Sequence, residues 1–567
     1  MNKRFLIILV ALLIALRWIF PESDPAWWFN IEDLHDEAWW AENARRKIIF
    51  NEWMWDEYAG ALASGPLAAV WHWITFKLFG ISFFSLRLVS LIPATLMLIL
   101  LWFRNTLSNN ENKVGFFLLA SSPAFFSLNR VGYLEMMLIL ILLLSITLIQ
   151  KRKIWASVFS GILFCSGLLF KGSFIFLLVP LLIWLWLDSS NRKHLLISTS
   201  VLAILSLISL LIYFIPNRAL FAPYVNAFSQ DYILANVLYD PRGWIARLAW
   251  LPEKSWISSP LACWLGIYTL IKISKGYIPS FKSSVWGLFI LVILFALFTD
   301  FSDRRLSVLI ILLPFIILED FKIETQTFQN IFIGFILSLS LIPWIIGHIP
   351  KGSYDLLLNE SGKFGLMLLA LNIVGYLFLK VLNIQKPSIY ILRTGIACWI
   401  LAVMHYSAVN IAALLDINYW LLMVVQSFLS LLILNYEYQF VKMRLTNATL
   451  AKSLIGAQIL ILLSVVLLPS YTLLKTAQHV SKIVRPEERI TGPNNAIELC
   501  FLSKGKTYMY ASKSNTDDRI FVGYYSNFNH NSSVVNENNT IFKPQIGQRF
   551  SLFPLPKKHK TEAIIIY

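Results

Sequence analysis

Charged residues are scarce in this chain of 567 residues, since Asp, Glu, Lys and Arg together make up only 14% of it. An ordinary soluble domain carries about 25%, and here 57% of the residues are hydrophobic, so a soluble globular enzyme is excluded. Aromatic residues reach 15%, and the 24 glycines show no period of three, which excludes a disordered chain and a collagen-like fibre. The composition predicts a polytopic membrane protein.

Cysteine is also scarce, and nucleotide-binding motifs are missing. Cys165, Cys263 and Cys398 lie within apolar runs and only Cys500 lies in a polar segment, so no disulfide framework is predicted. The sequence has no Gly-rich phosphate loop or dinucleotide fingerprint, which argues against ATP-driven transport and a soluble nucleotide-sugar fold. No compact ligand spacing accompanies His35 or His72, so the sequence assigns no metal or other cofactor and leaves a divalent metal open.

Basic residues outnumber acidic ones by 48 to 32, a net charge of +16. In a membrane protein such residues collect in cytoplasmic loops beside anionic lipid, so the charge does not indicate nucleic acid as a partner. Lys3 and Arg4 precede the apolar run from Phe5 to Phe20, which has no small-x-small cleavage site after it. We therefore expect an uncleaved first span with a cytoplasmic N-terminus.

About 20 apolar residues are needed to cross a hydrocarbon core roughly 30 Å thick, and runs of that kind predict roughly 13 to 15 transmembrane helices. Three segments on the outer side are too long to be simple turns: 21–81, 216–258 and everything after about Thr476. The chain is thus divided into a transmembrane domain, 1–476, and an extracytoplasmic domain, 477–567. Short β-type runs at 496–501, 519–522 and 563–566 predict that the latter is a small β-containing soluble domain.

The first outer segment is predicted to hold two helices at the membrane surface. One follows Asp36 and Glu37. One face of this helix is apolar, whereas Glu42, Arg45 and Arg46 point away from that face. The other runs from Pro66 to Phe79, with proline at its start and aromatic side chains suited to the membrane interface. Asp36 and Glu37 either cap the first helix or supply a carboxylate that deprotonates an acceptor hydroxyl or amine; the two roles are compatible.

Several charges are predicted near the outer face. Arg130 and Glu135 begin the fourth span, and Lys171 joins the fifth span to the sixth. Further basic residues near this face are Arg242, Arg247, Arg304 and Arg305. Each one alone is explained by a snorkelling anchor or an intramolecular ion pair. Together they predict a cationic receptor for a phosphate, in which Glu135 orients a neighbouring cation.

The order of these elements resembles the GT-C superfamily of membrane glycosyltransferases, in particular the protein O-mannosyltransferases and the lipid A aminoarabinose transferases. The stretches that carry the resemblance are Asp36-Glu37, Ser64-Gly65-Pro66-Leu67, Phe76-Lys77-Leu78-Phe79-Gly80, Arg87, Asn129 to Glu135, Gly167 to Gly172, and Asp303 to Leu306 followed by Pro314. The resemblance implies that Asp36 is the catalytic carboxylate, with Glu37 in support. Ala63-Ser64-Gly65-Pro66 stands where aminoarabinose transferases usually have Glu-Lys-Pro-Pro, which favours a broader polyprenyl-phosphate-sugar family.

The function expected from this resemblance is an inverting transfer of a sugar from a polyprenyl-phosphate donor, for example undecaprenyl phosphate, to an acceptor on the outer face. The acceptor is a protein, lipid A or another envelope glycan, and membrane lipid is the remaining partner. The expected location is the bacterial inner membrane, with the active site and the C-terminal domain on the periplasmic or extracellular side. The alternatives are a sugar-lipid flippase or transporter that breaks no bond, and a scaffold for an envelope complex.

Overall fold

A computed structural model describes residues 3–24, 35–53, 59–106 and 110–228 of the chain. Beyond residue 228 it describes shorter stretches, chiefly 285–298, 327–342, 354–415, 471–486 and 498–509, and the short strands given below.

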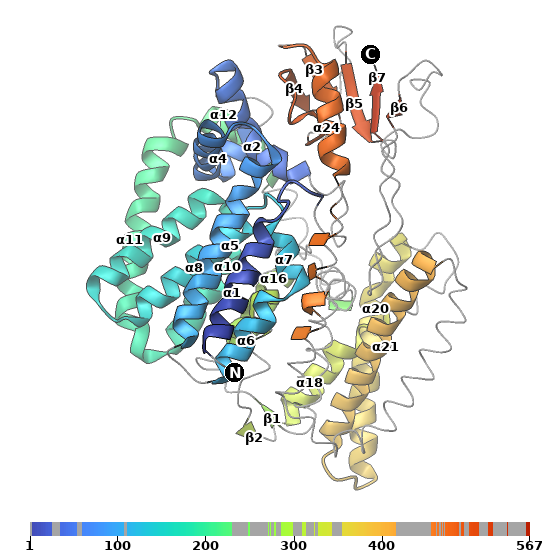
Figure 1. Ribbon diagram of the computed structural model, residues 1–567. Coiled ribbons are helices and arrows are strands. Elements are labelled where there is room, and N and C mark those ends of the chain that lie inside the picture. The colour runs from blue at the N-terminus through green and yellow to red at the C-terminus, as the bar shows by residue number, and fades with distance from the viewer. Residues whose placement is uncertain are drawn as a thin grey trace.

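The first half of the chain forms a bundle of apolar helices (Figure 1). These helices are α1 (Lys3–Trp18), α5 (Phe83–Thr106), α6 (Asn110–Ala120), α7 (Pro123–Asn129), α8 (Glu135–Gln150), α9 (Ile154–Phe170), α10 (Ile175–Leu187) and α11 (Arg192–Ser209), the last continued by a π-helical turn at Leu210–Phe214. The apolar run that begins near Val114 is divided between α6 and α7. Pro123 starts α7, and the Ser122 hydroxyl caps it by accepting a hydrogen bond from the Phe125 N–H.

Membrane-spanning character follows from length and composition. Within the described ranges, Phe83–Phe103 and Ser189–Phe214 are long and apolar enough to cross a bilayer, and shorter apolar helices of 10–17 residues accompany them.

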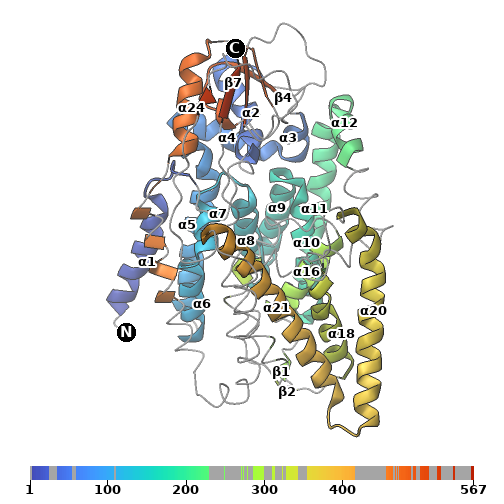
Figure 2. The ribbon, with the colours of Figure 1, turned by 90° about the vertical axis from the view of Figure 1, so that its right-hand side faces the viewer.

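A separate group of helices, α18 (Thr327–Ser338), α20 (Tyr354–Val381) and α21 (Pro387–Leu415), lies beside the bundle (Figures 1 and 2). The total of roughly 13 to 15 spans stays a prediction.

Several helices from the segments predicted to lie on the outer side gather at the end of the bundle that lies opposite the N-terminus (Figures 1 and 2). They are α2 (His35–Phe50), α3 (Ala59–Ser64), α4 (Pro66–Phe79), α12 (Arg218–Phe228) and α24 (Thr472–Ile483). The helix predicted from Pro66 to Phe79 is confirmed with these bounds, and Pro66 lies in its first turn.

Five strands near the C-terminus form a sheet at the same end of the bundle (Figure 1). They are β3 (Arg489–Gly492), β4 (Lys506–Met509), β5 (Ile520–Tyr524), β6 (Ile541–Phe542) and β7 (Ala563–Ile566), in the order β4-β3-β5-β7-β6. Strand β3 is parallel to β4 and β5, whereas β7 is antiparallel to β5 and β6. A separate antiparallel pair joins β1 (Tyr277–Ile278) to β2 (Lys322–Ile323).

The β-type run at 496–501 is not a strand where it is described, because residues 498–500 form a 3₁₀ turn. This turn buries the consecutive side chains of Leu499, Cys500 and Phe501, whereas a strand would alternate them between two faces. The boundary expected at residue 476 falls within α24, and the separate extracytoplasmic domain stays a prediction.

The membrane-surface position expected for α2 stays a prediction, and the side of this helix that carries Glu42, Arg45 and Arg46 is buried. Glu42 and Arg45 are both 0% exposed and Arg46 is 6% exposed. Residues of the C-terminal region cover this side of the helix, since Arg45 donates hydrogen bonds to the carbonyls of Ser503 and Gly505. Backbone carbonyls of a distant segment leave no sequence pattern around α2.

Candidate active site

A buried ion pair fixes the first turn of α2. The helix begins at His35, so Asp36 and Glu37 lie in this turn. The Glu37 carboxylate lies 3.2 Å from Nε of Arg87, a residue near the start of α5, and both side chains are at most 1% exposed. An unpaired carboxylate at such a depth would be strongly unfavourable, and Arg87 offsets part of that cost.

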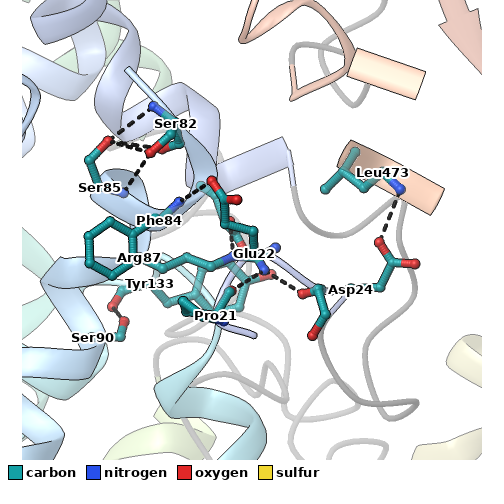
Figure 3. A network of polar contacts seen from close by, with 12 residues as sticks. Pro21, Glu22, Asp24, Ser82, Phe84, Ser85, Arg87, Ser90, Tyr133 and Leu473 are labelled. Atoms are coloured by element: carbon teal, nitrogen blue, oxygen red, sulfur yellow. Dashed lines mark hydrogen bonds and ion pairs between the residues drawn. The ribbon is translucent and has the colours of Figure 1, made fainter. Parts of the chain in front are cut away.

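Arg87 also binds the segment that follows α1. Its Nη1 donates to the carbonyls of Pro21 at 2.9 Å and Ser23 at 2.6 Å. In the same segment, Glu22 accepts a hydrogen bond from the Phe84 N–H at 3.2 Å, in the first turn of α5. Figure 3 shows these contacts around Arg87. The segment after α1 and the first turns of α2 and α5 are therefore held together around Arg87.

The ionisation of Glu37 is set by two opposing effects. Burial raises the pKa of Glu37 above its ordinary value, while the charge and hydrogen bond of Arg87 and a backbone hydrogen bond from Gly132 lower it. Desolvation is the larger of these effects. Glu37 thus accepts hydrogen bonds from groups outside its own helix, so its part in the structure is to attach α2 to α5 and to the Gly132 backbone.

A second ion pair lies where α8 begins and α9 ends. Lys171 Nζ and Glu135 Oε1 are 2.5 Å apart, and their side chains are 14% and 9% exposed. Glu135 is the first residue of α8, where a carboxylate meets the positive end of the helix dipole. Lys171 follows the last residue of α9 and has an extended backbone conformation. Its ammonium also lies over the Trp40 ring of α2, 5.3 Å from the centroid.

The junction between α3 and α4 lies against Trp40 and the end of α9. A Cβ placed on Gly65 would lie 2.5 Å from the Phe170 carbonyl oxygen and 2.7 Å from the Trp40 ring. Only glycine permits this approach. Because Phe170 directly precedes Lys171, the Ser64-Gly65-Pro66 turn, Trp40 and the Glu135–Lys171 pair form one cluster, which we call the Lys171 cluster.

Arg130 lies elsewhere and is engaged by the protein. It is 1% exposed, and its guanidinium donates to the carbonyls of Ile19, at 2.7 Å, and Phe20, and to the Ser23 hydroxyl at 2.5 Å. It also lies over the Phe126 ring. Arg130 is therefore an intramolecular anchor for the segment after α1, which is one of the two interpretations that the sequence allowed.

The other predicted site residues divide into two groups. Glu37 lies in α2, Glu135 begins α8 and Lys171 follows α9, so these three residues are in the part of the chain that the structure describes. The side chain of Asp36 lies outside the described residues, as do Arg242, Arg247, Arg304 and Arg305.

His72, for which the sequence gives no metal-ligand spacing, is a buried residue of α4. It is 0% exposed, and its ring lies 5.8 Å from that of Phe76, centroid to centroid. Burial lowers the pKa of His72 to about 3, so the imidazole is neutral at ordinary pH. In the part of the chain that the structure describes, no group of three or more His, Cys, Asp or Glu residues could hold a metal ion.

Sequence reasoning missed the roles of two residues. The sequence singles out Arg87 only as part of the family resemblance, and its pairing with Glu37 across 50 residues has no local signal. Trp40 was assigned to an apolar helix face, whereas its ring borders Lys171. A basic residue that follows a predicted buried helix is a reason to look for an aromatic partner, but it does not identify one.

A protein-family model matches part of the first half of the chain. The family model described as dolichyl-phosphate-mannose-protein mannosyltransferase matches residues 63–218, a range that includes Gly65, Arg87, Glu135 and Lys171. No curated protein matches the chain.

Two solved structures are similar to the chain. They are ArnT from Cupriavidus metallidurans bound to undecaprenyl phosphate, with a TM-score of 0.52, and ArnT from the same organism in the apo state, with a TM-score of 0.46. Identity is 10% in both, and the matches cover 100% and 99% of this chain and 98% and 97% of the other. The first likeness shows a shared fold. Together with the family match, it confirms the resemblance to the GT-C superfamily of membrane glycosyltransferases.

Proposed function

We propose that the chain is a polyprenyl-phosphate-sugar-dependent glycosyltransferase that transfers a sugar to an acceptor at the outer face of a bacterial inner membrane. The observation that carries the proposal is the Lys171 cluster: a cation, a carboxylate and an aromatic ring meet beside the Ser64-Gly65-Pro66 turn, within the residues that the mannosyltransferase family model matches. The crystallised ArnT with the shared fold is bound to undecaprenyl phosphate, which supports a lipid-phosphate donor here.

Lys171 is the residue that we assign to the donor phosphate. Among the described residues its ammonium has one hydrogen-bond acceptor, Glu135. An ammonium has three donors, so others remain for a phosphate oxygen. Its side chain is 14% exposed, in contrast to that of Arg87, which is 0% exposed. Arg242, Arg247, Arg304 and Arg305 stay proposed contributors on the basis of the sequence, whereas Arg130 is left out because its guanidinium is bound to backbone carbonyls.

Asp36 is the proposed general base. It precedes Glu37, whose bond to Arg87 holds the first turn of α2 in place. In the proposed reaction, Asp36 takes the proton from the acceptor hydroxyl or amine as its oxygen or nitrogen bonds to the anomeric carbon. The bond from that carbon to the phosphate oxygen breaks, its electron pair stays on the phosphate, and Lys171 stabilises the charge that develops. Attack from the face opposite the leaving group inverts the anomeric centre.

The decisive variant is Asp36→Asn, because asparagine keeps the size of the side chain and removes its basicity. The purified protein in lipid is supplied with polyprenyl-phosphate sugars and a membrane extract, and transfer of labelled sugar is followed by mass spectrometry. We expect transfer to fall by about 10²- to 10⁴-fold with donor binding retained. Glu52→Gln is the matched control, since Glu52 is an exposed carboxylate of the same outer segment, and it should keep full activity.

The outcomes separate the alternatives. Unchanged turnover in Asp36→Asn would reject Asp36 as the base. Movement of the sugar lipid across vesicles without bond cleavage would replace the transferase with a flippase. The labelled product identifies the acceptor as protein, lipid A or another glycan.

A further inference from the structure

The C-terminal region packs directly on the helix that carries Asp36. One hydrophobic cluster contains Ala38, Ala41 and Ala44 of α2 together with residues of α24 and of the 498–501 turn. The three alanines are spaced three residues apart and so share one helix face. Phe501 is 0% exposed and contacts the rings of Phe76 in α4 and Phe83 in α5, with centroids 5.8 Å and 5.6 Å away. We call α24 and residues 498–505 the C-terminal clamp.

Buried charges reinforce this contact in the middle of α2. Arg45 Nε lies 2.9 Å from Glu42, and its Nη atoms donate to the Ser503 and Gly505 carbonyls at 3.1–3.3 Å. Both side chains of the ion pair are 0% exposed. A buried ion pair adds little net stability, but the contacts of Arg45 with the Ser503 and Gly505 carbonyls join α2 to the clamp. Arg45 therefore defines how the clamp is seated on α2.

The clamp is also connected to the start of α2 through the segment that follows α1. Asp24 accepts a hydrogen bond from the Leu473 N–H at 3.0 Å, in the first turn of α24 (Figure 3). The adjacent Ser23 carbonyl accepts from Arg87, which binds Glu37. The clamp is thus connected to α2 in two ways. It binds Arg45 directly, and it is linked to the first turn of α2 through Asp24, Arg87 and Glu37.

We infer that the C-terminal clamp holds the proposed catalytic helix in its reactive position, and that Arg45 and Asp24 are positioning residues for transfer. The inference rests on the proposed function, because it concerns where α2 presents Asp36. A helix is rigid along its length, so a shift where Arg45 is attached also moves the first turn. Misplacement of a reacting group by about 1 Å costs up to about 100-fold in rate.

The test uses the full-length protein in lipid and two pairs of variants. Arg45→Gln removes the contacts with the clamp carbonyls, and Lys47→Gln is its matched control, because Lys47 lies on the same helix and makes an exposed hydrogen bond to the Asn51 carbonyl. Asp24→Ala removes the acceptor for the Leu473 N–H, whereas Asp24→Asn keeps an oxygen that can accept it. Transfer is measured as kcat per donor-binding site, counted with labelled undecaprenyl phosphate, so that unfolded molecules do not enter the rate.

We expect kcat per site to fall by about 10- to 100-fold in Arg45→Gln, less in Asp24→Ala, and by less than about twofold in Lys47→Gln and Asp24→Asn. The KM for the donor should stay unchanged. Unchanged kcat per site in Arg45→Gln and Asp24→Ala, with active wild-type protein, would overturn the inference. A loss of binding sites at constant kcat per site would also overturn it, since the two residues would then only stabilise the fold.

Cys500 gives a readout that does not depend on activity. Cys500 is 4% exposed and its thiol lies close enough to Arg45 for that charge to affect it; burial raises the pKa of Cys500 to about 12. Alkylation of Cys500 by a maleimide, quantified on its peptide, should be about tenfold faster in Arg45→Gln and unchanged in Lys47→Gln. Equal alkylation rates would show that Arg45 does not seat the clamp. If the wild type transfers no sugar, the proposed function fails, while this labelling still reports whether the clamp opens.

Discussion

Two ion pairs lie at the same end of the molecule, and they differ in what surrounds the cation. Arg87 is fully buried and is bound by Glu37 and by the carbonyls of Pro21 and Ser23. Lys171 is partly exposed and has Glu135 and the Trp40 ring as neighbours. The first cation is used to join helices, whereas the second retains donors for a ligand. Position in the sequence does not show whether a cation at membrane depth anchors the fold or binds a ligand. The exposure of its side chain and the hydrogen-bond acceptors around it distinguish the two roles.

The largest stability effect is expected when the buried pair is broken. Arg87→Met leaves Glu37 buried without its cation and leaves two carbonyls without their donor, so we expect a loss of about 3–5 kcal/mol of unfolding free energy. Thermal unfolding in detergent measures this loss.

The double variant Arg87→Met/Glu37→Leu is the control for that prediction. It removes both charges, and replacement of a buried pair by apolar residues is often neutral, so most of the lost stability should return. If the double variant is as unstable as the single one, the carbonyl contacts of Arg87 outweigh its pairing with Glu37.

A smaller effect is expected at the turn that closes the Lys171 cluster. In Gly65→Ala the new methyl group would overlap the Phe170 carbonyl and the Trp40 ring, so the turn must move away, at a cost of about 1–3 kcal/mol. Transfer should fall while the lipid phosphate still binds. Gly375→Ala is the matched control, because its nearest neighbour would lie 3.4 Å away, an ordinary contact. Full activity in Gly65→Ala would show that the position of this turn is unimportant.

His72 contrasts with the two ion pairs, because it is a buried titratable group for which burial alone accounts for the pKa shift. Its pKa is about 3 in the folded protein and 6.5 in the unfolded chain, so the unfolded chain takes up a proton first as the pH falls. Stability should be constant above pH 6.5 and decrease below it, by about 2 kcal/mol at pH 5. His72→Gln should lose this part of the pH dependence, measured as the difference in unfolding between the two proteins. An identical pH dependence in both would contradict the burial of a neutral imidazole.

The sequence predicted the features that depend on local patterns. The bounds of α4 followed from Pro66 and its aromatic residues, the starts of several spans from apolar runs, and the pairing of Glu135 with a nearby cation from their shared place near the outer face. Contacts with distant backbone could not be predicted: Arg45 binds carbonyls 458 and 460 residues away. The burial of this side of α2 is therefore not evident from the sequence.

The central claim is that Lys171 binds the lipid phosphate while Arg87 serves the fold. Its most direct test is the affinity of undecaprenyl phosphate for three proteins: the wild type, Lys171→Gln and Lys171→Gln/Glu135→Gln, the last of which leaves no unpaired carboxylate. We expect both variants to bind about tenfold more weakly, with the double variant within about 1 kcal/mol of wild-type stability. Wild-type affinity in both variants would contradict the account, because the donor phosphate would then bind elsewhere.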